Sequence, residues 1–147
     1  MNIDEYIASR VDDQIEWYDR KSIACQKRYK TAQTIEIILA SLIPLLSPYA
    51  TDYAVIAFII GAIGSAIAII ESLTKLYKWH ENWIEYRSTC ELLRFQKNLF
   101  ITRSAPYNTE PESIENIFVY NIENIISSEN NKWKIINTNS TNKNKTT

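Results

Sequence analysis

The sequence predicts an all-α integral membrane protein built around a hairpin of two transmembrane helices. Two stretches, residues 37–51 and 53–70, contain no charged side chain. Apolar residues on either side of these stretches recur at helical spacing. The 147 residues include only two glycines, and both lie inside the second stretch. This argues against hairpin-rich β architecture, whose tight turns usually need glycine or asparagine.

Residues 2–30 are predicted to form a cytoplasmic amphipathic helix, and residues 31–50 the first span. The charge-free part of this span covers about 22 Å of helix, which is short for a hydrocarbon core of about 30 Å. Extending it toward the N-terminus places Glu36 inside the span, near its cytoplasmic end. A carboxylate there is expected to snorkel, pair with a cation or face an aqueous cavity.

Residues 53–71 form the second predicted span. Small residues lie on one side of it at helical spacing, and the three at its centre, Ala57, Gly61 and Ser65, are called the small-residue stripe. Such a stripe lets another helix approach closely in lipid. The favoured partner is the first span of the same chain, and a second copy is the alternative. Between the spans, Ser47 to Asp52 is a predicted turn, with Asp52 capping the next helix.

No glycine or proline follows the second span until Pro106, so one long helix is expected to continue through residues 72–102. Its apolar positions follow a heptad, which predicts that both Trp79 and Trp83 are core residues. The N-terminal helix should lie antiparallel against it. Residues 109–133 are predicted to form a C-terminal helix capped by Thr109 and Glu112, and residues 134–147 a disordered tail. Residues 1–133 are expected to form a single domain.

Basic residues flank both outer ends of the apolar block, whereas the turn between the spans has none. They are Lys27, Arg28, Lys30, Lys75 and Lys78. The positive-inside rule therefore predicts that both termini are cytoplasmic. In that reducing compartment Cys25 and Cys90 are expected to stay unbridged. The N-terminal region is acidic and has no apolar core, so no signal peptide is expected there.

No enzyme site is predicted. His80 is the only histidine, and no cysteine or carboxylate around it has metal-ligand spacing. We therefore expect no metal and no cofactor. The net charge of −1 gives no general attraction to nucleic acid. Glu36 and Glu71 are candidates for an acidic pore mouth that favours cations; for Glu71, pairing with Lys75 is the favoured alternative. Arg87 and Glu91 should form an intrahelical ion pair.

Several short motifs occur in order around the predicted hairpin. They are Asp13-Gln14-Ile15-Glu16-Trp17-Tyr18, Lys27-Arg28-Tyr29, Glu71, Trp83, Arg87, Glu91, Leu92, Pro106-Tyr107, Ile125-Ile126, Glu129 and Trp133. With these motifs the chain resembles the SLATT family, bacterial two-transmembrane effector domains linked to nucleotide-signalling conflict systems. Within the cytoplasmic part the resemblance rests mainly on Trp83, Arg87, Glu91, Pro106, Tyr107 and Trp133. Relatives carry a glutamate near position 96, where this chain has Gln96.

The resemblance implies a homo-oligomeric, multi-pass protein of the bacterial inner membrane. Such an effector would form a pore or depolarise the membrane when a cytoplasmic signalling or sensor partner detects infection, as in an antiphage response. The first alternative is a membrane-anchored helical scaffold that binds a cytoplasmic partner without conducting ions. A soluble helical bundle is the second alternative, and it is disfavoured because the second span is apolar around its whole circumference.

Overall fold

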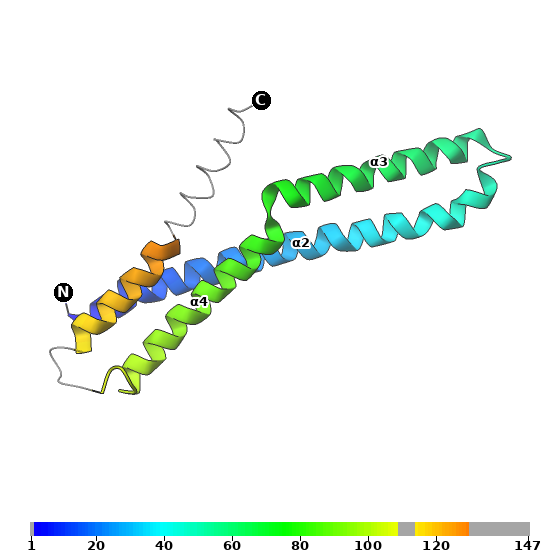
Figure 1. Cartoon of the computed structure of the whole chain (residues 1–147). Helices are drawn as coiled ribbons and strands as arrows, with labels where there is room; N and C mark the ends of the chain where they lie inside the picture. The colour runs from blue at the N-terminus through cyan, green and yellow to red at the C-terminus, as the bar shows by residue number, and fades with distance from the viewer. Residues whose placement is uncertain (1, 109–113, 130–147) are drawn as a thin grey trace, which may run out of the picture. The chain divides into compact units, whose positions relative to one another are not determined.

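The computed structural model describes residues 2–108 and 114–129, and these residues form helices joined by short turns and loops (Figure 1). In chain order the elements are α1 (Ile3–Tyr6), the π-helix η1 (Ile7–Val11), α2 (Asp12–Leu46), the 3-10 helix η2 (Ser47–Tyr49), α3 (Ala54–Tyr77), α4 (Trp79–Ile101) and a C-terminal helix over residues 114–129. The predicted all-α hairpin is confirmed. The predictions for Thr109, Glu112, Trp133 and residues 134–147 lie outside the described residues.

The hairpin consists of α2 and α3, which Figure 1 shows running back alongside each other. Both are long and apolar enough to cross a membrane. Only 6% of the apolar segment of the first helix and none of that of the second is buried inside the protein. The core helix of a soluble bundle would be mostly covered, so these exposures disfavour the soluble-bundle alternative.

The turn between the two helices lies where it was predicted, at η2 and the residues after it. Pro48 lies in the first turn of η2, where its missing N–H does no harm. The capping role predicted for Asp52 is wrong. Tyr53 occupies the N-cap position of α3 with extended backbone and no side-chain cap bond. Helix α3 thus begins one residue later than predicted, which leaves Asp52 one position outside the cap.

The predicted continuous helix from the second span through residue 102 is interrupted at Lys78. This residue has φ 49° and ψ 42°, in the left-handed region, so α3 ends at Tyr77 and α4 begins at Trp79. The Asn82 amide donates to the Tyr77 carbonyl over 3.2 Å, which satisfies one carbonyl freed at the end of α3. The heptad therefore fails before the break, where Leu76 is 71% exposed.

The contacts of the chain define two compact units. The hairpin unit is Lys21–Glu85, and the terminal unit combines Met1–Arg20 with Tyr86–Thr147. In the terminal unit the N-terminal segment pairs antiparallel with α4, as predicted: the Lys97 ammonium contacts Asp12, and Arg87 contacts Asp19 at 3.1 Å. The core between them and the C-terminal helix is apolar. Its fully buried side chains include Val11, Cys90, Leu93, Tyr107, Phe118 and Ile122.

Candidate functional site

A group of polar side chains lies between α2 and α3 at the end of the hairpin away from the turn. This polar cluster consists of Gln33 and Glu36 on α2, with Glu71, Thr74 and Lys75 on α3. The spacings of three and four residues place these side chains on one face of each helix. Beside the cluster is a hollow of about 240 Å³, lined in part by Tyr29, Gln33, Glu71, Thr74 and His80.

Glu36 is the innermost carboxylate of the polar cluster. Its Oε2 accepts a hydrogen bond of 2.7 Å from the Gln33 amide. Its Oε1 is buried and has no hydrogen-bond partner among the described residues. The same is true of the Thr74 hydroxyl, one turn beyond Glu71 on α3. Buried polar atoms are usually paired, so these two leave hydrogen-bonding capacity inside the hairpin that a proton, a cation or water can use.

Glu71 pairs with Lys75 at 2.9 Å, which is the favoured alternative of the sequence analysis. The Glu71 hydrogen bond and charge raise the pKa of Lys75, and the charge of Glu36 adds a smaller effect in the same direction. Glu36 therefore acts electrostatically on a side chain of the opposite helix. The structure brings the two predicted carboxylates into one cluster, together with Gln33 and Thr74, which sequence reasoning did not select.

Aromatic side chains adjoin the polar cluster. The His80 ring lies 4.7 Å from Tyr29 and 5.8 Å from Trp83, centroid to centroid, and the Lys30 ammonium lies 5.7 Å from the Trp83 ring. Trp79 and Trp83 were predicted as core residues, but both are only half-buried. Both tryptophans precede Tyr86, the first buried position of this heptad on α4, so the buried part of the heptad begins later along the helix than predicted.

At Gly61 the small-residue stripe does not contact the first span of the chain. Ala57, Gly61 and Ser65 are all exposed, and a Cβ built on Gly61 meets no other atom within 4 Å. The less exposed side of α3 carries large residues instead: Ile56, Ile60, Ile63, Ile67 and Ile70. The stripe therefore lies on the more exposed side of α3, open to a second copy.

The motif residues of the terminal unit are structural. Arg87 bonds both Asp19 at 3.1 Å and Glu91 at 2.6 Å, so the predicted pair with Glu91 is confirmed and extended to the N-terminal segment. Tyr107 is fully buried after the cis peptide at Pro106. Its hydroxyl donates to the Gln96 Oε1, and the Asn121 amide donates to its oxygen at 2.9 Å.

Long-range ion pairs of this unit were not predicted, since no local pattern joins residues about one hundred positions apart. Arg10 forms two bonds to Glu123, at 3.1 and 3.2 Å, and the Tyr6 hydroxyl adds a third at 2.9 Å. Cys25 and Cys90 are free thiols, as predicted. Burial raises the pKa of the Cys90 thiol.

Within residues 2–108 and 114–129, no group of three or more histidine, cysteine, aspartate or glutamate side chains is placed to hold a metal ion. No curated protein and no solved structure matches the chain. A family model does match: residues 13–114, which include both apolar helices and α4, fit the model DUF4231, described as a protein of unknown function. This match spans more than half of the sequence, and the chain therefore belongs to the DUF4231 family.

Proposed function

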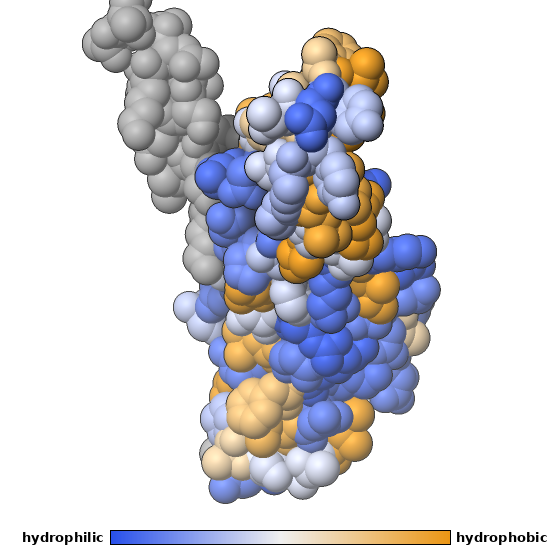
Figure 2. All heavy atoms as spheres, turned by 90° about the vertical axis from the view of Figure 1, so that its right-hand side faces the viewer, coloured by the Kyte–Doolittle hydropathy of each residue, from blue (hydrophilic) through white to orange (hydrophobic). Residues whose placement is uncertain are grey.

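We propose that this chain is a multi-pass protein of a bacterial inner membrane, with both termini in the cytoplasm. Large apolar side chains cover the outside of the hairpin, where Phe58 is 79% and Ile37 69% exposed. Figure 2 shows such hydrophobic side chains at the surface around the hairpin turn. A contiguous apolar surface of this kind is unfavourable in water and suits hydrocarbon. The basic residues at the end of the hairpin away from the turn, and the absence of basic residues from the turn, support the orientation.

We further propose that several copies assemble into a non-enzymatic effector that makes this membrane permeable to ions. The observation that carries this proposal is the Glu36 carboxylate, whose Oε1 has no hydrogen-bond partner among the described residues although it lies at the end of an apolar helix segment. A charge in that position is costly unless it faces an aqueous path or a cation. Two helices alone enclose no lumen, so a conducting path requires more than one copy.

Assembly is supported by the exposed small-residue stripe. Gly61 carries no side chain and has open space around it, so a neighbouring helix can approach its backbone closely. The resemblance to SLATT effectors supports the biological setting: a bacterial conflict or antiphage response in which a cytoplasmic sensor supplies the trigger. The terminal unit, with its own apolar core, would receive that signal.

A membrane-anchored scaffold is the second candidate. It is favoured by the terminal unit, where Arg87, Glu91 and Tyr107 all stabilise a helical assembly that could serve as a docking platform. The scaffold and the effector share the hairpin and its orientation. They differ in whether ions flow, so conductance separates them.

The topology is tested with single cysteines in a Cys25→Ser/Cys90→Ser background. Thr51→Cys, at the turn, should react with a membrane-impermeant maleimide added outside intact cells. Ser104→Cys, in the exposed loop after α4, should react only after the membrane is opened. The reverse pattern would refute the orientation, and extraction of the protein without detergent would refute membrane insertion.

Conduction is tested by inducing the full chain in bacteria and following membrane potential with a dye, then recording reconstituted protein in bilayers. Glu36→Gln combined with Glu71→Gln should change the cation preference while the protein still assembles. Glu115→Gln, an exposed carboxylate of the C-terminal helix, is the matched control and should change nothing. Oligomers with their trigger present that stay silent in bilayers would favour the scaffold.

A further inference from the structure

A second hollow of about 400 Å³ lies on the hairpin unit, between α2, α3 and the start of α4. Its wall is almost wholly apolar and includes Ala32, Ile35, Ile70, Leu73 and Trp79. Its volume and composition are those of a small-molecule site, which is typically apolar with a few polar groups that fix orientation. The polar cluster has a separate hollow with different chemistry, so the two are distinct features.

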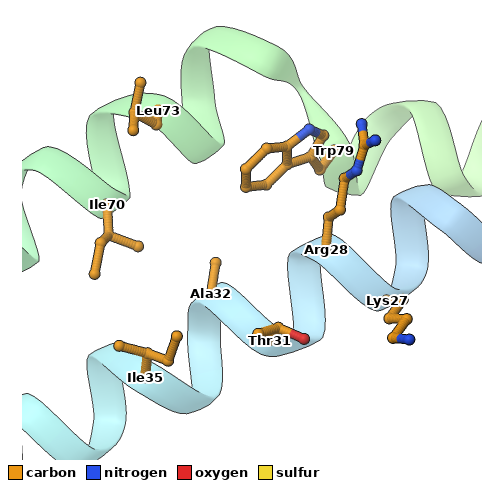
Figure 3. Close-up of a pocket in the computed structure, with 8 residues that line it drawn as sticks. All are labelled: Lys27, Arg28, Thr31, Ala32, Ile35, Ile70, Leu73 and Trp79. Atoms are coloured by element: carbon orange, nitrogen blue, oxygen red, sulfur yellow. The ribbon is translucent and has the colours of Figure 1, made fainter.

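Two basic residues line one end of this apolar hollow. Arg28 and Lys27 both line it, and neither forms an ion pair with any described residue. By contrast, Lys75 pairs with Glu71, and the Lys30 ammonium lies over the Trp83 ring. Figure 3 shows the Arg28 guanidinium beside the Trp79 indole at one end, while Lys27 extends away from the hollow.

The apolar and basic parts of the hollow lie in line along α2. Arg28, Ala32 and Ile35 are spaced by four and three residues, so they share one helix face. Arg28 and Ile35 are seven residues apart, which separates them by about 10 Å along the helix axis. In Figure 3, Ile35 and Ile70 lie at the end opposite Arg28 and Trp79. A ligand that fits must therefore combine an anionic head with an apolar chain.

We propose that this hollow binds an anionic phospholipid, with the phosphate at Arg28 and an acyl chain along Ile35, Ile70 and Leu73. The proposal rests on the membrane location proposed above. A guanidinium fork matches phosphate geometry, and an indole is suited to the headgroup level. Basic pockets between membrane helices on the cytoplasmic side are the places where anionic headgroups bind. Lys27 strengthens the local positive field without lying inside the hollow.

The test is native mass spectrometry of the full chain in mild detergent, with phosphatidylglycerol or phosphatidylcholine of the same acyl chains. Phosphatidylglycerol should bind at least tenfold more tightly. Arg28→Gln should weaken its binding about fivefold, the effect of one basic residue near a headgroup, and Lys27→Gln should weaken it less. Lys30→Gln removes an equal charge from the same helix outside the hollow and should leave binding unchanged.

The apolar wall is tested separately. Ile35→Trp narrows the hollow without changing its charge and should weaken the binding of phosphatidylglycerol, whereas Ile37→Trp, on a strongly exposed part of the same helix, should not. Equal binding of the two lipids would overturn the proposal. So would competition by inorganic phosphate at the same concentration as the lipid, which would indicate a free-anion site.

One further result would identify a different occupant. If Ile35→Trp disrupts oligomers while phosphatidylglycerol still binds, the hollow is a contact between copies and the lipid proposal fails. The proposed membrane location is measured on the same preparation by its need for detergent. A detergent-dependent protein without phosphatidylglycerol preference overturns the lipid site alone, whereas a protein that stays in solution without detergent overturns both proposals.

Discussion

Removing one hydroxyl from the core of the terminal unit should loosen that whole unit. Tyr107 is fully buried, its hydroxyl donates to Gln96, and the Asn121 amide donates to its oxygen. The ring also packs edge-on against Phe100 and Phe118, each at 5.8 Å between centroids. Tyr107→Phe keeps these ring contacts and deletes only the two hydrogen bonds.

The size of the destabilisation follows from the two polar groups that lose their hydrogen-bond partner. Both partners, the Gln96 carbonyl oxygen and an Asn121 N–H, lose a bond in a partly buried place. Leaving buried polar groups unsatisfied costs about 1–3 kcal/mol. At 1.4 kcal/mol per factor of ten, this raises the population of the open terminal unit by about 5- to 140-fold. Tyr120→Phe is the matched control, because Tyr120 is 68% exposed and its hydroxyl stays in water.

Opening of the terminal unit can be measured by the chemical labelling of Cys90, a fully buried thiol of the same unit. In a Cys25→Ser background, Cys90 is the single thiol, and its labelling rate reports how often the unit opens. Tyr107→Phe should speed labelling by the factor above, and Tyr120→Phe by less than twofold. Equal rates in the two variants would show that the Tyr107 bonds do not hold the unit together.

Three further predictions concern charge and backbone. Arg10 holds the pKa of Glu123 below its usual range, so this pair should stabilise the terminal unit above about pH 4.3 and lose that contribution as the pH falls further. In acid titrations followed by circular dichroism, the stability of Glu123→Gln should therefore depend less on pH than that of the wild type. The difference should be under about 1 kcal/mol, because the pair is nearly half exposed. Lys78→Gly should raise the free energy of unfolding by about 1 kcal/mol, since glycine adopts the left-handed backbone without strain; a lower melting temperature would contradict this. Gly61→Ile should lower the oligomer fraction in detergent without lowering the melting temperature, since a Cβ at Gly61 has open space around it. Val55→Ile should change neither, and unchanged oligomers in Gly61→Ile would remove the packing role of the stripe.

Much of the fold could be predicted from the sequence because its main determinants are local. The absence of charge over residues 53–70 required an apolar surrounding, and α3 is the helix that results. The amphipathic helix predicted over residues 2–30 carries Val11, Ile15 and Tyr18 at helical spacing, and all three are buried. The Glu71–Lys75 and Arg87–Glu91 pairs follow from helical spacing alone.

The misplaced features depend on information that no local pattern holds. Lys78 adopts a left-handed backbone that usually requires glycine or asparagine, so nothing in the sequence indicated the end of α3. The small-residue stripe seemed to fit the partner helix, yet the less exposed face of α3 is lined with isoleucine. Close approach is one way to pack helices in lipid, and interlocked β-branched side chains are another. A stripe alone does not decide between them.

The two units expose opposite kinds of chemistry, which constrains any signal between them. The terminal unit buries aromatic side chains such as Tyr107 and Phe118 and leaves the Arg10–Glu123 ion pair nearly half exposed, as a protein in water does. The hairpin unit exposes its apolar side chains and holds polar ones, Glu36 and Thr74, within. Helix α2 contributes to both units without interruption. From Asp19, held by Arg87, to Glu36 it runs about 25 Å. A partner that altered the Asp19 ion pairs would therefore act on the same continuous helix that carries the Glu36 carboxylate.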